Sequence, residues 1–208
     1  NLPKDDEMKF LGQIYKIKFD ENFKEPFFDG EFVFTPNLKS LECFKKVRAK
    51  ELFLELFIKA CGLENFGLDS QNAKVYKEYE NIDIYITDGT KHIILENKIN
   101  AGDQEAQIKR YIKTVQKEND GEAEIYVLFL SPQGRKPSDY SLSGLKIEGG
   151  KILDKNGDET AKFKVISYDK EVTAWLDLCL EETGNLTNLA TVISQYKNVI
   201  EKVYEKYK

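Results

Sequence analysis

The chain has 208 residues, 41% of them hydrophobic, which is enough for one α/β domain with a sizeable core. Its 31 basic and 36 acidic residues give a net charge of −5, which excludes the broad basic surface of a protein that coats nucleic acid nonspecifically. No run approaches the roughly 18 apolar residues of a membrane span, and the first residues lack a signal peptide's apolar stretch. We therefore expect a soluble, cytoplasmic protein with no membrane association.

The rarest residue types exclude two kinds of metal site. Cys43, Cys61 and Cys179 show no Cys-x-x-Cys spacing and lie in apolar or helix-like stretches. We expect buried free thiols in a reducing compartment and no thiolate zinc site. His92 is the only histidine, which excludes a site built from several histidines, and we expect an ordinary strand residue beside a turn.

The N-terminal part predicts an irregular lead-in followed by a helix. Residues 1–40 hold short aromatic pieces interrupted by Pro26, Gly30 and Pro36, and they predict one or two short strands. Residues 41–60 keep apolar side chains at helical spacing and predict a long amphipathic helix. We expect residues 1–208 to form a single domain whose core, with its C-terminal helices, spans residues 41–208.

The rest of the chain predicts a mixed β-sheet flanked by helices. Between residues 73 and 98 the apolar period changes to two, which indicates three successive strands, with Asp88-Gly89 as a hairpin turn. The remaining predicted elements are a helix over 104–118, a strand over 125–130, a loop over 131–150, a strand over 162–167 and helices over 172–180 and 187–207. This order predicts an α/β fold.

An Asp, a Glu and a Lys fall on one face of the predicted hairpin. If Asp88-Gly89 is a two-residue turn, Asp83 lies opposite Ile94, and Asp83, Glu96 and Lys98 share one parity. Asp83 and Glu96 are then diagonal neighbours about 7 to 8 Å apart at the backbone, so both carboxylates can reach one cation. The same pattern also fits a solvated sheet face with alternating charge, and the three residues by themselves do not separate the two interpretations.

The chemistry of this set points to hydrolysis of a phosphate ester. Hard carboxylate oxygens favour Mg²⁺, which keeps several waters and takes one or two carboxylates plus substrate phosphate oxygens. Such an ion lowers the pKa of a bound water and neutralises charge on the phosphate. Lys98 is placed to hold or deprotonate the attacking water, or to stabilise the developing oxyanion.

Three motifs occur in order along the chain: Glu80-Asn81-Ile82-Asp83-Ile84, Leu95-Glu96-Asn97-Lys98-Ile99, and Gln107 with Tyr111. Together they resemble the PD-(D/E)XK nuclease superfamily, in the branch with a Glu-Asn-Lys active-site motif, over roughly residues 45–205. The resemblance implies a restriction-endonuclease-like core.

The resemblance also implies roles for individual residues. Asp83, Glu96 and the carbonyl of Asn97 would be metal ligands, and Lys98 the catalytic lysine. Gln107 and Tyr111, one helical turn apart, would position water or phosphate, although they also fit a helix surface with a tyrosine at the core edge.

Two further acids have weaker support. Relatives often carry an acid on the preceding helix, where Glu51 and Glu55 are both available, and we select Glu51. The Asp-Pro and His-Gly loop that usually follows that acid has no counterpart here. Glu80 falls on the apolar parity, which favours a structural role for it.

The implied activity is that of a Mg²⁺-dependent endonuclease, with Mn²⁺ as a substitute, that hydrolyses DNA in defence against, or processing of, foreign DNA. A homodimer would follow if both strands are cut, because that needs two sites. Two alternatives stay open: an inactive nuclease-fold module that binds DNA or a protein, and a nuclease directed to RNA.

Overall fold

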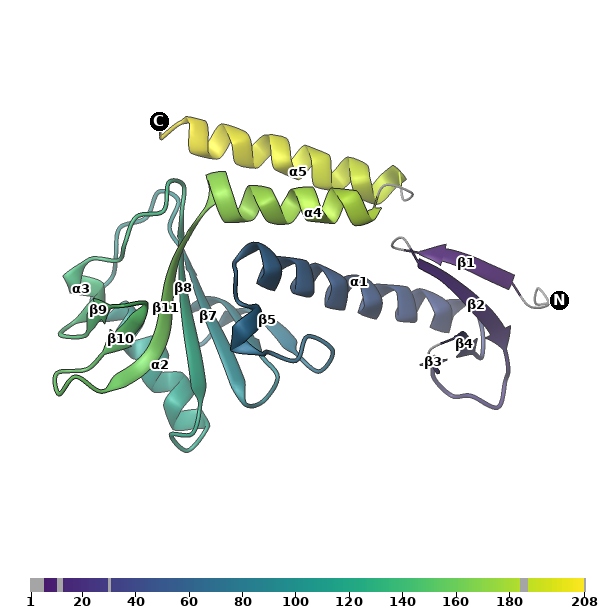
Figure 1. The fold of residues 1–208 in the computed structure, drawn as a ribbon, viewed down its shortest axis with the longest axis horizontal. Coiled ribbons are helices and arrows are strands. Elements are labelled where there is room, and N and C mark those ends of the chain that lie inside the picture. Colours follow the sequence, from purple (N-terminus) through teal and green to yellow (C-terminus); the bar gives the residue numbers. More distant parts are fainter. Residues whose placement is uncertain (1–5, 11–12, 30, 184–186, 208) are drawn as a thin grey trace. The chain divides into compact units, whose positions relative to one another are not determined.

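The computed structural model of the chain (Figure 1) describes residues 6–10, 13–29, 31–183 and 187–207. The chain divides into two compact units, residues 1–57 with 175–197 and residues 58–174 with 198–208, and each has its own buried apolar cluster. The single-domain organisation stays a prediction. Across the described ranges, no helix combines the length and apolar character needed to cross a membrane.

A small sheet in the first unit replaces the expected irregular lead-in. Its strands β1 (Asp6–Phe10), β2 (Gln13–Phe19), β3 (Phe27–Phe28) and β4 (Phe32–Thr35) are ordered β1-β2-β4-β3. The pattern of apolar residues does not reveal this sheet, because β2 pairs in parallel with β4, which is not the next segment of the chain. Its two faces also differ unusually: Tyr15, Ile17 and Val33 are buried, whereas Phe32 and Phe34 share the other face with lysines of β2.

Three helices complete the first unit: residues 38–57 of α1 (Leu38–Ala60), residues 175–183 of α4 (Thr173–Thr183) and residues 187–197 of α5 (Thr187–Glu205). The Trp175 indole donates to the Phe53 carbonyl at 2.9 Å, and Lys197 forms an ion pair with Asp177. The first helix begins three residues earlier than the predicted Leu41, because Asn37 Oδ1 accepts the backbone N–H of Ser40 at 2.9 Å and caps it.

The second unit is built on a seven-stranded mixed sheet, which confirms the expected α/β class. The strands are β5 (Lys74–Tyr79), β6 (Ile82–Thr87), β7 (Lys91–Asn97), β8 (Glu124–Ser131), β9 (Lys146–Glu148), β10 (Lys151–Leu153) and β11 (Glu159–Ser167). They are ordered β5-β6-β7-β8-β11-β10-β9, with β7, β8 and β11 parallel in the centre and antiparallel hairpins at both edges.

The central strands of this sheet are covered on both faces. Helix α2 (Gln107–Glu118) joins β7 to β8, and its Ile108, Ile112 and Val115 share one buried cluster with residues of β6, β7 and β8. On the other face, Phe66 of the short 3-10 helix Glu64–Phe66 meets the Tyr126 ring edge-on at 5.4 Å. The central strands are therefore buried on both sides, as the continuous apolar run over 125–130 predicts.

The segment 131–150 is not entirely loop. It contains α3 (Asp139–Leu142) and β9, and β9 pairs with β10 in a hairpin. Each of these two strands has three residues, too few to show a period of two in the sequence. A π-helical turn, Tyr168–Val172, precedes α4.

The β6–β7 hairpin has a longer loop than predicted. Asp88 Oδ1 accepts the backbone N–H groups of Thr90 and Lys91 at 2.9 and 2.8 Å, and the last strand pair is Thr87 opposite His92. The register is thus shifted by two residues, which preserves the parity of every side chain. In this register Ile84 lies opposite Leu95, and the next pair is Asp83 and Glu96. The two acids therefore lie directly opposite each other rather than diagonally.

The rare residues behave largely as expected. Cys61 and Cys179 are buried and free, and burial raises the pKa of both thiols to about 12. The side chain of Cys43 lies outside the described residues. His92 is buried in β7, where its Nδ1 shares a 2.7 Å hydrogen bond with the Tyr85 hydroxyl.

The core between α2 and the sheet gives a stability prediction. Ile108 has 0% of its surface exposed, so Ile108→Ala should lower the free energy of unfolding by about 2–5 kcal/mol in urea denaturation. Val75→Ala, at an edge-strand residue with 49% exposure, should cost less than about 1 kcal/mol. Equal losses for the two variants would contradict this arrangement of the core.

Candidate metal centre

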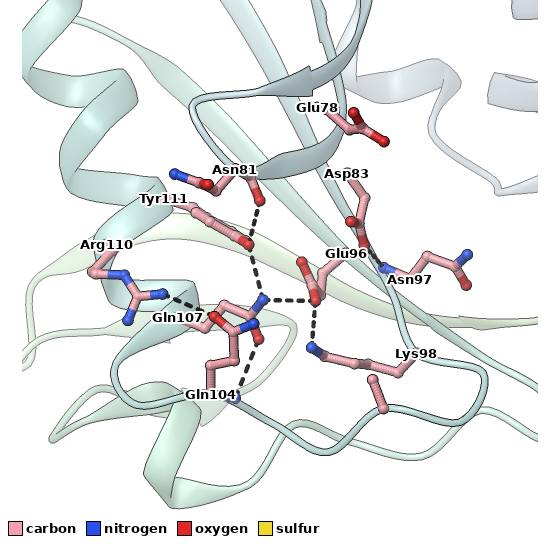
Figure 2. A pocket seen from close by; sticks show the side chains of 11 residues that line it. Glu78, Asn81, Asp83, Glu96, Asn97, Lys98, Gln104, Gln107, Arg110 and Tyr111 are labelled. Carbon is pink, nitrogen blue, oxygen red and sulfur yellow. Dashed lines mark hydrogen bonds and ion pairs between the residues drawn. The ribbon is translucent and has the colours of Figure 1, made fainter.

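All the predicted site residues except Glu51 line one cavity of about 690 Å³ in the second unit (Figure 2). Strand β6 supplies Asp83, β7 supplies Glu96 and Asn97, and Lys98 follows directly. Gln107 and Tyr111 reach the cavity from α2. The sheet parity inferred from the sequence is therefore the one that the fold adopts.

Glu96 is the centre of the polar contacts in this cavity. The residue is 1% exposed, and its Oε1 is contacted by the Lys98 ammonium at 2.6 Å and by the Gln107 amide at 2.8 Å. Its Oε2 is buried and has no hydrogen-bond partner in the described part of the chain. Burial raises the pKa of Glu96, and the Lys98 ammonium acts in the opposite direction.

Asp83 is fixed against the neighbouring strand. Its Oδ2 accepts the backbone N–H of Asn97 at 2.7 Å. The Asn97 side chain is engaged elsewhere, because its Oδ1 accepts the Tyr168 hydroxyl at 2.8 Å. The assignment of the Asn97 carbonyl as a metal ligand stays a prediction.

Gln107 and Tyr111 are both buried, so neither lies on a solvated helix surface. The Gln107 amide oxygen accepts the Gln104 backbone N–H at 3.4 Å, which turns the Gln107 NH₂ toward Glu96 and Tyr111. Burial raises the pKa of Tyr111 to about 12, so its hydroxyl stays protonated and donates to the Asn81 carbonyl at 2.5 Å.

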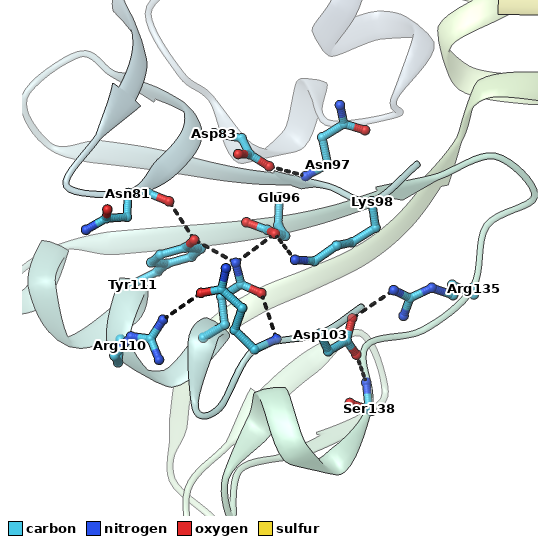
Figure 3. A network of polar contacts seen from close by, with 12 residues as sticks. Asn81, Asp83, Glu96, Asn97, Lys98, Asp103, Arg110, Tyr111, Arg135 and Ser138 are labelled. Atoms are coloured by element: carbon cyan, nitrogen blue, oxygen red, sulfur yellow. Dashed lines mark hydrogen bonds and ion pairs between the residues drawn. The ribbon is translucent and has the colours of Figure 1, made fainter. Parts of the chain in front are cut away.

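Helix α2 begins at Gln107 rather than at the predicted Gln104 because Ala106 adopts a left-handed conformation, with φ of 50°. The preceding loop is held by Asp103 (Figure 3), which pairs with Arg135 at 2.8 Å and accepts the Ser138 N–H at 2.6 Å. Burial would raise the pKa of Asp103, but these two partners lower it to about 2. The start of α2, and with it Gln107, is therefore positioned by an ion pair outside the cavity.

Sequence reasoning missed five residues that line the cavity: Glu78, Asn81, Ala101, Gln104 and Arg110. Glu80 and Asn81 form a two-residue turn between β5 and β6, with φ of 47° and 67°. The register of that hairpin sets Glu78 opposite Asp83 and leaves Glu80 exposed at the turn. The one sequence signal for Glu78 was the alternation of side chains along β5. Once the Glu80-Asn81 turn is known, this alternation puts Glu78 on the same face of the sheet as Asp83.

The expected helix acid is in the other unit. Glu51 is largely buried there, and its carboxylate forms a 2.7 Å ion pair with Arg48. Glu55 is exposed. The assignment of Glu51 as an additional catalytic acid stays a prediction.

The donor set in the cavity suits a hard cation. No group of three or more His, Cys, Asp and Glu that could hold a metal occurs among the described residues. Mg²⁺ binds through one or two carboxylates and keeps several waters, so Asp83, Glu96 and a carbonyl make a sufficient set. The buried Oε2 of Glu96, which has no hydrogen-bond partner within the described ranges, is an acceptor that a cation would satisfy.

The buried Lys98–Glu96 pair predicts a pH-dependent loss of stability. In Lys98→Met, Glu96 loses the group that lowers its pKa, so this pKa rises further in the folded state. A carboxyl whose pKa is raised on folding favours the folded state below its unfolded pKa, and this contribution is lost as the pH rises through the folded pKa. In EDTA, the variant should lose about 3–5 kcal/mol at about pH 8 and less at about pH 5.

Adding Glu96→Gln to Lys98→Met supplies the matched control. It removes the titrating group, so the double variant should show little of this pH dependence in urea denaturation. A loss in Lys98→Met that is the same at both pH values would contradict the electrostatic account.

Comparison with known proteins gives a family match across most of the chain. Residues 10–198 match the family model described as PD-(D/E)XK nuclease superfamily. Neither the curated proteins nor the solved structures contain a match to the chain. The family match confirms the restriction-endonuclease-like fold that the motifs imply. The chain belongs to the PD-(D/E)XK nuclease superfamily.

Proposed function

We propose that the chain is a Mg²⁺-dependent endonuclease that hydrolyses phosphodiester bonds in DNA. The observation that carries the proposal is the Glu96 carboxylate, which is buried beside Asp83 and Lys98 and keeps one oxygen without a hydrogen-bond partner among the described residues. A binding module has no need of such a group, because an unsatisfied buried oxygen is costly unless a ligand meets it.

The bound metal would be held by Asp83, Glu96 and the Asn97 carbonyl, and Mn²⁺ would substitute for Mg²⁺. When bound, the ion activates water and neutralises charge on the phosphate. Lys98 keeps its ammonium against Glu96 Oε1, where its remaining N–H groups can hold the attacking water or the phosphate oxyanion. Gln107 and Tyr111 hold Glu96 in place, and Gln107 orients one carboxylate oxygen so that the other is left for the metal.

The biological setting rests on the resemblance to the family. It comprises DNA as substrate, a cytoplasmic location and a role against, or in processing of, foreign DNA. Double-strand cleavage would require two copies of the centre, hence a homodimer. RNA shares the same phosphodiester chemistry, so it belongs among the substrates of the test.

The direct test is cleavage of supercoiled plasmid, linear duplex, single-stranded DNA and RNA with Mg²⁺ or Mn²⁺. Asp83→Asn and Lys98→Ala should each reduce the rate by at least about 100-fold, because each removes a group that acts on the developing charge. Asp120→Asn, at an exposed loop position, is the matched control and should keep full activity. An intact rate in Asp83→Asn would rule out this centre, and cleavage of RNA alone would replace DNA as substrate.

Metal binding provides a test that does not depend on finding the substrate. At about 100 times the dissociation constant, Mg²⁺ or Mn²⁺ should stabilise the wild type by about 2.7 kcal/mol in thermal unfolding, because the ion binds only the folded protein. Asp83→Asn should lose most of this stabilisation, and Asp120→Asn should retain it. An ion-induced stabilisation that is equal in all three proteins would show that the ion binds elsewhere.

A further inference from the structure

The outward side of α2 carries a row of positive charge. Its inward residues face the metal centre and the sheet, whereas Arg110, Lys113 and Lys117 are exposed. Glu118 is the one acidic residue of the helix. In a chain whose net charge is −5, such a local excess of cations marks a surface suited to an anion.

Two cavities flank this side of the helix. The metal cavity includes Arg110, and a second cavity of about 510 Å³ is lined by Lys109 and Lys113 of α2 and by Lys155 of the β10–β11 turn. Residues three apart are neighbours on a helix surface, so Lys113 follows Arg110 directly. The cationic groups therefore continue from the metal cavity into the second cavity.

These charges are not neutralised by nearby carboxylates. Arg110 donates to the Glu105 carbonyl and to the Gln104 amide oxygen, and Lys109 donates to the Ser143 carbonyl at 2.8 Å. All three acceptors are uncharged. Among the residues that the structure describes, no ion pair involves Lys109, Arg110, Lys113 or Lys155.

The second cavity has one carboxylate in its lining, that of Asp154. Its Oδ1 accepts the backbone N–H groups of Asn156 and Asp158 at 2.8 and 3.0 Å, so it is engaged in stabilising its own turn. Three lysines against this one carboxylate leave the cavity with a net positive charge.

We propose that Arg110, Lys109, Lys113 and Lys155 form a phosphate track that binds the nucleic-acid backbone beyond the scissile phosphate. The inference rests on the proposed nuclease function and extends it from the metal centre to the substrate strand. Lysine ammonium groups attract phosphate without reading base edges, so the track binds the strand independently of its sequence.

The test measures binding separately from cleavage. Fluorescence anisotropy with labelled single-stranded DNA, duplex DNA and single-stranded RNA of equal length is carried out in EDTA, where metal-dependent hydrolysis does not occur. Lys113→Ala and Lys155→Ala should each weaken binding about fivefold to tenfold at low salt, to a similar extent for unrelated sequences. Each should also make the slope of log K against log salt shallower by about 0.7 to 0.9, since one phosphate contact is lost.

Lys74→Ala is the matched control, because Lys74 is an exposed lysine at the end of β5 away from Glu78 and the metal cavity. It should leave both the affinity and the salt slope unchanged, and thermal unfolding of all three variants verifies that they fold. Affinities and slopes for Lys113→Ala and Lys155→Ala that equal those of Lys74→Ala would overturn the track. A wild type that binds none of the three nucleic acids would also overturn it.

The outcomes separate the track from the nuclease function. If Asp83→Asn abolishes cleavage while the lysine variants bind normally, the nuclease stands and the track is wrong. If the wild type cleaves nothing but its binding depends on Lys113 and Lys155, the track stands and the proposed catalysis is wrong.

Discussion

The structure of the site depends on one buried carboxylate, that of Glu96. Taking this charge out of water is unfavourable, and its pairing with the equally buried Lys98 offsets that cost only in part. One oxygen is contacted by Lys98 and Gln107, and the other has no hydrogen-bond partner in the part of the chain that the structure describes. The folded chain thus holds an acceptor ready for a cation, and burial raises the pKa of this carboxyl. Buried carboxylates with shifted pKa values are typical of functional sites.

The surrounding fold serves to hold that carboxylate still. Strand β7 is buried in the middle of the sheet, which gives Glu96 a rigid backbone, and Asp83 is tied to the same strand through Asn97. Helix α2 contributes Gln107, which donates to Glu96, and Tyr111, which donates to the Asn81 carbonyl in the β5–β6 turn. The β5–β6 turn, β7 and α2 therefore converge on one carboxylate.

Much of this centre was predictable from the sequence because strand parity depends only on alternation. Asp83, Glu96 and Lys98 lie on the predicted face, even though Asp88 lengthens the hairpin loop, because a shift of two residues preserves parity. Glu78 and Asn81 were missed because Glu78 and both residues of the Glu80-Asn81 turn have positive φ although none of them is glycine.

The N-terminal sheet could not be predicted either, since a parallel pairing of β2 with β4 leaves no local trace. Sequence patterns likewise do not report which carboxylate oxygen lacks a partner.

The most direct measurement is the anomalous scattering of crystals soaked in Mn²⁺. The account predicts a peak between Asp83 and Glu96, within about 2.0–2.3 Å of Glu96 Oε2, because that is the usual distance from a carboxylate oxygen to such an ion. A fully occupied ion elsewhere, with Glu96 Oε2 bonded to a protein group, would contradict the claim that this carboxylate is a metal ligand.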